Sequence, residues 1–159
     1  MSLPPFDHVV TEHGPVVLRV CRALLGAVDA EDAWSETFLS ALRAYPDLRA
    51  DSDVRAWLVT IAHHRAIDLL RRRARTAVPT AELDDRAGPD GEDLPDEQLR
   101  AAVQSLPPKQ RAAVAYRYLA DLSYAQIGEL LDSSEAAARR SAADGIAALR
   151  TRDLQGAPR

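Results

Sequence analysis

An acidic segment rich in proline and glycine divides the sequence into two parts, each with the apolar spacing of helices. The segment, TAVPTAELDDRAGPDGEDLPDEQ, has no sustained apolar period. Residues 76–97 contain one arginine against eight acidic residues, and such a block of like charge is typical of a solvated linker. The sequence therefore predicts two small domains, residues 1–75 and 98–159, joined by an acidic linker over residues 76–97.

The composition favours helices in both parts. Hydrophobic residues make up 47% of the 159 residues and charged residues 28%, which is a globular balance. Aromatic residues are only 5%, so the core must be built from Leu, Ala, Val and Ile, a set that favours helices over sheets. We therefore expect an all-α fold.

In the first part, three stretches have helical spacing of apolar residues. They begin near Phe6, near Asp29 and near Val54, and the last runs to about Arg75. Their expected boundaries are an interruption or kink at Gly14-Pro15, a stop at Gly26, a cap at Asp29 and a stop before Pro46.

The second part has the pattern of a helix-turn-helix. DEQLRAAVQSL is predicted as a helix, and Pro107-Pro108 then breaks the chain. Ser123 can cap YAQIGELL, the turn DSS follows, and Ser134 can open a last helix that runs to about Arg152. Helix, tight turn and helix at this spacing are typical of a DNA-binding unit.

The segment HHRAIDLLRRRAR has five arginines and one acid, Asp68. Guanidinium groups bind phosphate oxygens in a bidentate manner, although cations near a helix C-terminus are favoured by the helix dipole in any case. Trp57 and the pair His63 and His64 stand beside the cluster and can stack on an unpaired base. This combination favours single-stranded nucleic acid as a ligand. The whole-chain charge of −4 does not exclude nucleic acid, because affinity follows local basic surface rather than whole-chain charge, and residues 98–159 are also net basic.

Metal and enzyme chemistry have little support in the sequence. His64 and Asp68 are four residues apart, as in a metal pair or an ordinary hydrogen-bonded pair, but a zinc or iron site needs further ligands. There is no glycine-rich phosphate loop, no G-x-S-x-G and no cysteine with an obvious histidine partner. We expect no metal, no cofactor and no catalysis, and we interpret Cys21 as a small core residue.

The sequence predicts a cytoplasmic location without membrane insertion. The N-terminus MSLPPFDHVV lacks the charged and apolar regions of a signal peptide, and no apolar run approaches membrane-spanning length. A single cysteine suits a reducing compartment.

Three segments together resemble an extracytoplasmic-function (ECF) sigma factor of bacterial RNA polymerase. DAEDAWSETFLSAL, by itself an ordinary amphipathic helix, resembles the region 2 helix that docks on the polymerase β′ coiled coil. VRAWLVTIAHHRAIDLLRRRAR resembles the part that melts and reads the minus-10 element. LPPKQRAAVAYRYLADLSYAQIGELLDSSEAAARR resembles region 4, whose helix-turn-helix reads the minus-35 element.

The resemblance implies a role for particular residues. Contacts with core polymerase are expected from Asp29, Asp32, Glu36 and Phe38. Contacts with minus-10 DNA are expected from Arg49, Arg55, Trp57, His64, Arg65, Arg71, Arg72 and Arg73, with a flipped base held by the loop at roughly Leu48 to Asp53. Contacts with minus-35 DNA are expected from Ser133, Ser134, Glu135, Arg139 and Arg140.

The implied function is promoter-specific transcription initiation by an alternative sigma factor. Its partners would be the β′ and β subunits of core RNA polymerase and promoter DNA. An anti-sigma factor is a further partner that only the family resemblance implies. A helix-turn-helix regulator or a degenerate sigma-like protein without initiation activity is the alternative. The negative charge of the acidic linker has two interpretations: the linker mimics nucleic acid, or it only keeps the chain soluble.

Four residues depart from the family pattern. Ser35 stands where Gln is usual, and Asp132 stands in a turn where Gly is common and positive φ is expected. In the last helix, Asp144 would repel phosphate, and Gly145 weakens a helix by about 1 kcal/mol relative to Ala. The last helix is therefore expected to make few base contacts and to rely on phosphate positioning and DNA shape.

Overall fold

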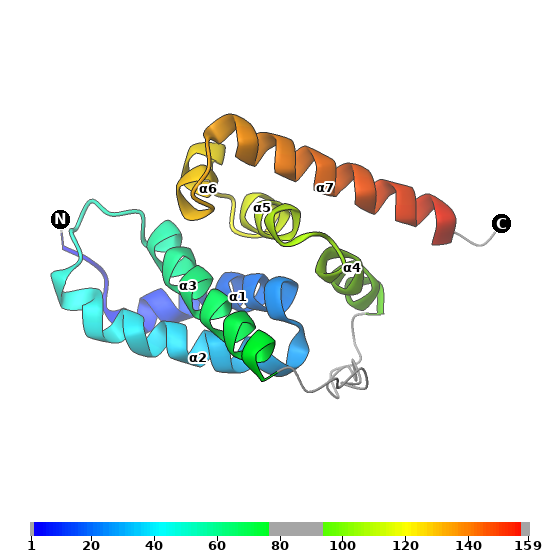
Figure 1. Cartoon of the computed structure of the whole chain (residues 1–159). Coiled ribbons are helices and arrows are strands. Elements are labelled where there is room, and N and C mark those ends of the chain that lie inside the picture. Colours follow the sequence, from blue (N-terminus) through cyan, green and yellow to red (C-terminus); the bar gives the residue numbers. More distant parts are fainter. Residues whose placement is uncertain (1, 77–93, 157–159) are drawn as a thin grey trace.

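A computed structural model describes residues 2–76 and 94–156 of the chain, and these residues form helices and no strand. The all-α prediction is confirmed (Figure 1). The elements are α1 (Phe6–Leu25), α2 (Ala27–Ala44), the 3-10 helix η1 (Tyr45–Asp47), α3 (Val54–Arg75), α4 (Leu94–Gln104), α5 (Pro108–Tyr118), α6 (Tyr124–Leu130) and α7 (Glu135–Gly156).

Helices α1, α2 and α3 pack on one another and bury a core of small and medium apolar side chains. Val17 and Val20 of α1 and Leu58 of α3 are fully buried. The expected interruption of α1 is wrong, because the helix continues through Pro15. Val9 and Val17 are buried on either side of that proline, so tertiary packing outweighs the loss of one backbone hydrogen bond.

The predicted helix boundaries are correct at most positions in the first part. Gly26 ends α1 with a φ of +85°, a conformation that favours glycine. Asp53 caps α3, and its side chain accepts a hydrogen bond of 3.1 Å from Ala56 N. Asp29 is not a cap, because α2 begins directly after Gly26 and places Asp29 in its first turn.

Helices α4 to α7 form the second part, and their boundaries also follow local signals. Pro108 is the first residue of α5, and Ser123 and Gln126 form a reciprocal capping box at α6. Asp132, with a φ of +55°, lies in the turn between α6 and α7 as expected. The predicted linker lies mostly outside the described residues, and its last positions, residues 94–97, belong to α4.

The alanine-rich α7 packs closely on α5 and α6. Ala138 and Ala142 are fully buried. A Cβ at Gly128 would lie 2.8 Å from the carbonyl oxygen of Ser133, and a Cβ at Gly145 would lie 2.6 Å from Val114 Cγ2. Small residues are therefore what allows these helices to approach each other.

The two parts contact each other, with α4 and α5 against α1 and with α6 against α3 (Figure 1). Two side chains of the second part donate hydrogen bonds to backbone carbonyls at the end of α1. Gln104 Nε2 donates to Arg22 O at 2.9 Å, and Arg111 Nη1 donates to Leu24 O at 3.2 Å. Leu24 O lies in the last turn of α1, where a helix leaves carbonyl groups without intrahelical partners, whereas Arg22 O also accepts a hydrogen bond of 3.0 Å from Gly26 N.

Candidate functional site

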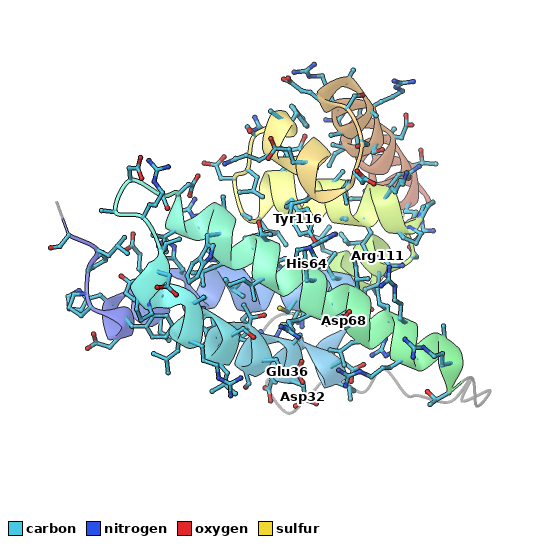
Figure 2. The ribbon with its side chains drawn as sticks, turned by 60° about the vertical axis from the view of Figure 1, so that its left-hand side comes forward. Asp32, Glu36, His64, Asp68, Arg111 and Tyr116 are labelled. Carbon is cyan, nitrogen blue, oxygen red and sulfur yellow. The ribbon has the colours of Figure 1, made fainter. Side chains whose placement is uncertain are left out.

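The outer side of α2 carries exposed apolar and acidic side chains. Figure 2 shows Asp32 and Glu36 on the side of α2 that points away from α4–α7. Val28, Leu39 and Leu42 have exposed fractions of 67%, 54% and 51%. Exposed apolar side chains with acidic neighbours are typical of a surface that binds another protein.

Two of the four residues predicted to contact polymerase have partners within this chain. Phe38 is only 6% exposed, and its ring centroid lies 4.7 Å from that of Trp34 and 6.4 Å from that of Phe6. Asp29 forms an ion pair with Arg73 of α3. The packing therefore places Phe38 in the core and gives Asp29 an internal partner.

Sequence reasoning missed the apolar part of this surface. Leu39 and Leu42 follow Phe38 closely, and nothing in their residue type separates them from the buried side chains. The signal that distinguishes them is their position on the helix, because they share a face with Asp32 rather than with the buried Thr37 and Ala41.

The C-terminal half of α3 carries the arginine cluster. Arg71 and Arg72 are exposed. Arg73 instead pairs with Asp29 and donates a hydrogen bond of 3.2 Å to Leu25 O, so it ties α3 to the junction of α1 and α2. Two of the predicted phosphate contacts are thus free to bind a ligand, and the third has a structural partner.

Three predicted minus-10 residues lie near the N-terminus of α3: Arg49 in the loop before the helix, and Arg55 and Trp57 in its first turn. Arg49 is exposed in the preceding loop and pairs with Asp51 at 3.1 Å. Trp57 is half-buried, with its ring centroid 6.2 Å from that of Tyr45. Arg55 is half-buried and lines an open hollow of about 430 Å³, whose other lining residues are His13, Ser52, Asp53, Val54, Asp121 and Leu122.

The two histidines in the middle of α3 differ in exposure to solvent. His64 is exposed, whereas His63 is buried against α5 and α6. His63 Nδ1 lies 2.5 Å from the hydroxyl oxygen of Tyr116, the α5 residue labelled in Figure 2. Asp68 pairs with Arg65 at 3.8 Å, which is a different partner from the His64 considered in the sequence.

Burial shifts the pKa of each titratable group in this contact. Desolvation and the neighbouring His64 lower the pKa of His63 to about 4, so the ring is neutral at neutral pH. Burial raises the pKa of the Tyr116 hydroxyl, and it raises the pKa of the Cys21 thiol to about 12. Cys21 is fully buried, and its raised pKa makes it an unreactive core residue.

The helix-turn-helix brings the predicted minus-35 residues together at the start of α7. Ser134 Oγ accepts a hydrogen bond of 3.0 Å from Ala137 N and caps the helix. Arg139 pairs with Glu135 at 3.2 Å, and Arg140 is exposed. Ser133 is half-buried in the turn.

Two family models match this chain over most of its length. Sigma-70 region 2 matches residues 9–76, which include most of α1 and all of α2 and α3, and Sigma-70 region 4 matches residues 96–149. Curated ECF sigma factors are similar over both segments. The chain belongs to the ECF sigma factor family.

Relatives of this sigma factor are similar over most of its length. It is 31% identical to the ECF RNA polymerase sigma factor SigE of Mycolicibacterium smegmatis over 82% of this chain and 54% of that protein. It is 30% identical to the RNA polymerase sigma factor CarQ of Myxococcus xanthus over 91% of this chain and 87% of that protein. The chain spans about half the length, or less, of the first curated relatives it matches.

A solved sigma-factor structure shares the fold. The sigma factor RpoE from Bartonella quintana, in complex with the anti-sigma factor NepR, aligns with a TM-score of 0.75 at 19% identity. The alignment covers 97% of this chain and 98% of that chain. At this identity the likeness shows the arrangement of the helices.

Residues 2–76 and 94–156 contain neither a candidate metal centre nor a candidate membrane span. No group of three or more His, Cys, Asp or Glu side chains there is arranged to hold a metal ion. In that same part of the chain, no helix has the length and apolar character needed to span a membrane.

Proposed function

We propose that this chain is an alternative sigma factor that binds core RNA polymerase and directs initiation at a limited set of promoters. Family regions 2 and 4 in the expected order are the observation that carries the proposal. Residues 1–75 would bind polymerase and minus-10 DNA, and residues 98–159 would bind minus-35 DNA. No catalytic step is assigned to this chain, and it would act in the cytoplasm with polymerase and promoter DNA.

The proposed polymerase surface is the outer side of α2. It comprises Asp32 and Glu36 together with the exposed Val28, Leu39 and Leu42. Apolar side chains would supply contact area with the β′ subunit, and the carboxylates would select a basic partner. Further polymerase contacts, including those with the β subunit, follow from the same family membership.

The proposed minus-10 surface is α3 with its preceding loop. Exposed Arg71 and Arg72 would neutralise phosphates. The half-buried Trp57 and Arg55 and the exposed His64 would lie near unpaired bases, with the loop at residues 48–53 holding a flipped base. Arg49 and Arg65 would make secondary phosphate contacts.

The proposed minus-35 surface is the N-terminal part of α7. In helix-turn-helix proteins this part of the recognition helix enters the major groove. Ser133, Ser134 and Glu135 lie there, and Arg139 and Arg140 supply its positive charge. The solved relative bound to an anti-sigma factor further supports an anti-sigma partner for this chain.

A charge reversal on α2 tests the core-binding part of the proposal. Asp32→Lys combined with Glu36→Lys places like charges against a basic partner, so we expect affinity for core polymerase to fall at least about tenfold. Glu12→Lys is the matched control, because Glu12 is an exposed acid on α1. Affinity is measured by fluorescence anisotropy of the labelled chain with purified core. Unchanged binding by the double variant, with a folded circular dichroism spectrum, would exclude this surface.

A further inference from the structure

The ring of Tyr124 contacts guanidinium groups from two other helices. Arg117 Cζ of α5 lies 4.8 Å from the ring centroid, and Arg139 Cζ of α7 lies 5.0 Å from it. Both distances are within the roughly 6 Å at which a cation is attracted to an aromatic face. Since Tyr124 is the first residue of α6, one ring connects α5, α6 and α7.

The position of this ring is fixed by its neighbours in the chain. Ser123 Oγ accepts a hydrogen bond of 3.1 Å from Gln126 N, and Gln126 Oε1 accepts one of 2.9 Å from Ser123 N. On the other side, Arg117 Nη1 donates to Leu122 O at 3.0 Å. The backbone before and after Tyr124 is therefore held, and the ring has a defined place from which to contact Arg139.

The contact leaves Arg139 able to bind a ligand. A guanidinium stacks through its face, while its N–H donors point outward in its plane. One nitrogen of Arg139 bonds to Glu135 at 3.2 Å, and the Arg139 side chain is still 59% exposed. The ring and the carboxylate together restrict a long side chain that would otherwise lose rotamer freedom on binding.

We propose that Tyr124 is a positioning residue for minus-35 recognition: its ring holds the Arg139 guanidinium ready to contact the DNA. The proposal rests on the function proposed above, because it requires α7 to bind minus-35 DNA. Arg140 is the natural comparison. It is exposed on the next position of α7, and within the described residues no aromatic ring contact involves it.

Two variants of Tyr124 separate the aromatic ring from its hydroxyl and from general packing. Tyr124→Leu removes the ring and keeps apolar bulk. Tyr124→Phe keeps the ring and removes the hydroxyl. Each is combined with Arg139→Ala and, as a matched control, with Arg140→Ala. Holoenzymes are assembled with purified core polymerase, and their affinities are measured for a promoter fragment and for the same fragment with its minus-35 element scrambled.

We expect Tyr124→Leu to weaken binding to the intact promoter about three- to tenfold, because both cation–π attraction and preorganisation are lost. Tyr124→Phe should bind within about twofold of the original chain, since the ring face is retained. In the Arg139→Ala background Tyr124→Leu should have no further effect, whereas in the Arg140→Ala background its full effect should persist.

Other outcomes overturn the proposal. Equal losses with Phe and Leu would assign the effect to the hydroxyl, and an undiminished loss in the Arg139→Ala background would show that the ring acts independently of Arg139. If the original holoenzyme binds intact and scrambled fragments equally, the proposed minus-35 function fails and the positioning role fails with it. If Arg139→Ala reduces minus-35 binding but Tyr124→Leu does not, the positioning role alone fails.

Discussion

At the scale of single residues, Gly145 lies in the middle of α7 where that helix packs on α5. A Cβ at this position would lie 2.6 Å from Val114 Cγ2, and Val114 is itself buried. Valine is short and stiff at χ1, so it has little freedom to move away. Packing and helix propensity therefore make opposite demands on this residue.

We predict that Gly145→Ala destabilises the fold. Better helix propensity contributes about 1 kcal/mol, but overpacking costs about 1–3 kcal/mol, so we expect a net loss of about 1 kcal/mol by urea unfolding. Ala143→Gly is the control: Ala143 is exposed on the same helix, and propensity alone should lower its stability. A Gly145→Ala protein that is more stable than the original would refute the packing argument.

His63 is the buried titratable group at the contact between the two regions. Its facing groups are the Tyr116 hydroxyl of α5, a backbone hydrogen bond with Leu130 of α6, and the neighbouring His64 ring at 5.7 Å. Cys21 is electrostatically coupled to Tyr116 and contributes to the raised pKa of its hydroxyl. The Cys21 thiol itself is uncharged at neutral pH, because burial raises its pKa to about 12. Burial holds the pKa of His63 at about 4, below its ordinary 6.5.

This lowered pKa predicts a loss of stability in mild acid. Between about pH 6.5 and pH 4 the unfolded chain binds a proton at His63 that the folded chain excludes. The free energy of unfolding should therefore be greatest above pH 6.5 and fall as the pH falls through this window. His63→Gln can still accept a bond from Tyr116 and should flatten the dependence. Urea unfolding at several pH values measures both slopes, and equal slopes would show that His63 is not responsible.

At the scale of elements, α3 uses neighbouring arginines for different purposes. Arg71 and Arg72 are exposed, whereas Arg73 pairs with Asp29 of α2 and donates to Leu25 O of α1. The helix thus presents two cations outward while a third holds its C-terminal half against the rest of region 2. Substitutions within a run of three arginines should therefore have unlike effects.

We predict that Arg71→Ala with Arg72→Ala lowers the affinity of holoenzyme for promoter DNA. The slope of log affinity against log salt should become shallower by about 0.9 for each lost phosphate contact, with stability unchanged. Arg73→Ala should instead cost about 1 kcal/mol of stability through its lost partners. Arg19→Ala, at an exposed arginine of α1, is the control. An unchanged salt slope in the double variant would exclude phosphate binding by these two residues.

The helices and most of their ends follow from local sequence, because a cap or stop depends on a few adjacent residues. Gly26, Asp53 and Ser123 illustrate this. Phe38 and Arg73 illustrate the limit. Both were expected on binding surfaces, but one packs with Trp34 and Phe6 and the other pairs with Asp29. Such partners are distant in sequence, so helical periodicity alone does not reveal them.

At the scale of the whole molecule, the two sigma regions share one apolar core cluster and are also joined by hydrogen bonds to backbone carbonyls and by the buried His63–Tyr116 pair. Gln104 and Arg111 bond to the end of α1, and His63 bonds to Tyr116. Sequence reasoning gave no sign of this contact, because carbonyl groups are present at every position and carry no residue signature. The order of the functional segments can nevertheless be predicted from the sequence, because each segment is a continuous stretch within one or two helices.

Transcription in vitro tests the central claim most directly. Purified core RNA polymerase and a pool of genomic fragments are incubated with and without the chain, and the transcripts are mapped. We predict chain-dependent transcripts from a small set of fragments that share minus-10 and minus-35 elements. Binding to core polymerase without an open complex on any fragment would contradict the account and would favour a sigma-like regulator that does not initiate transcription.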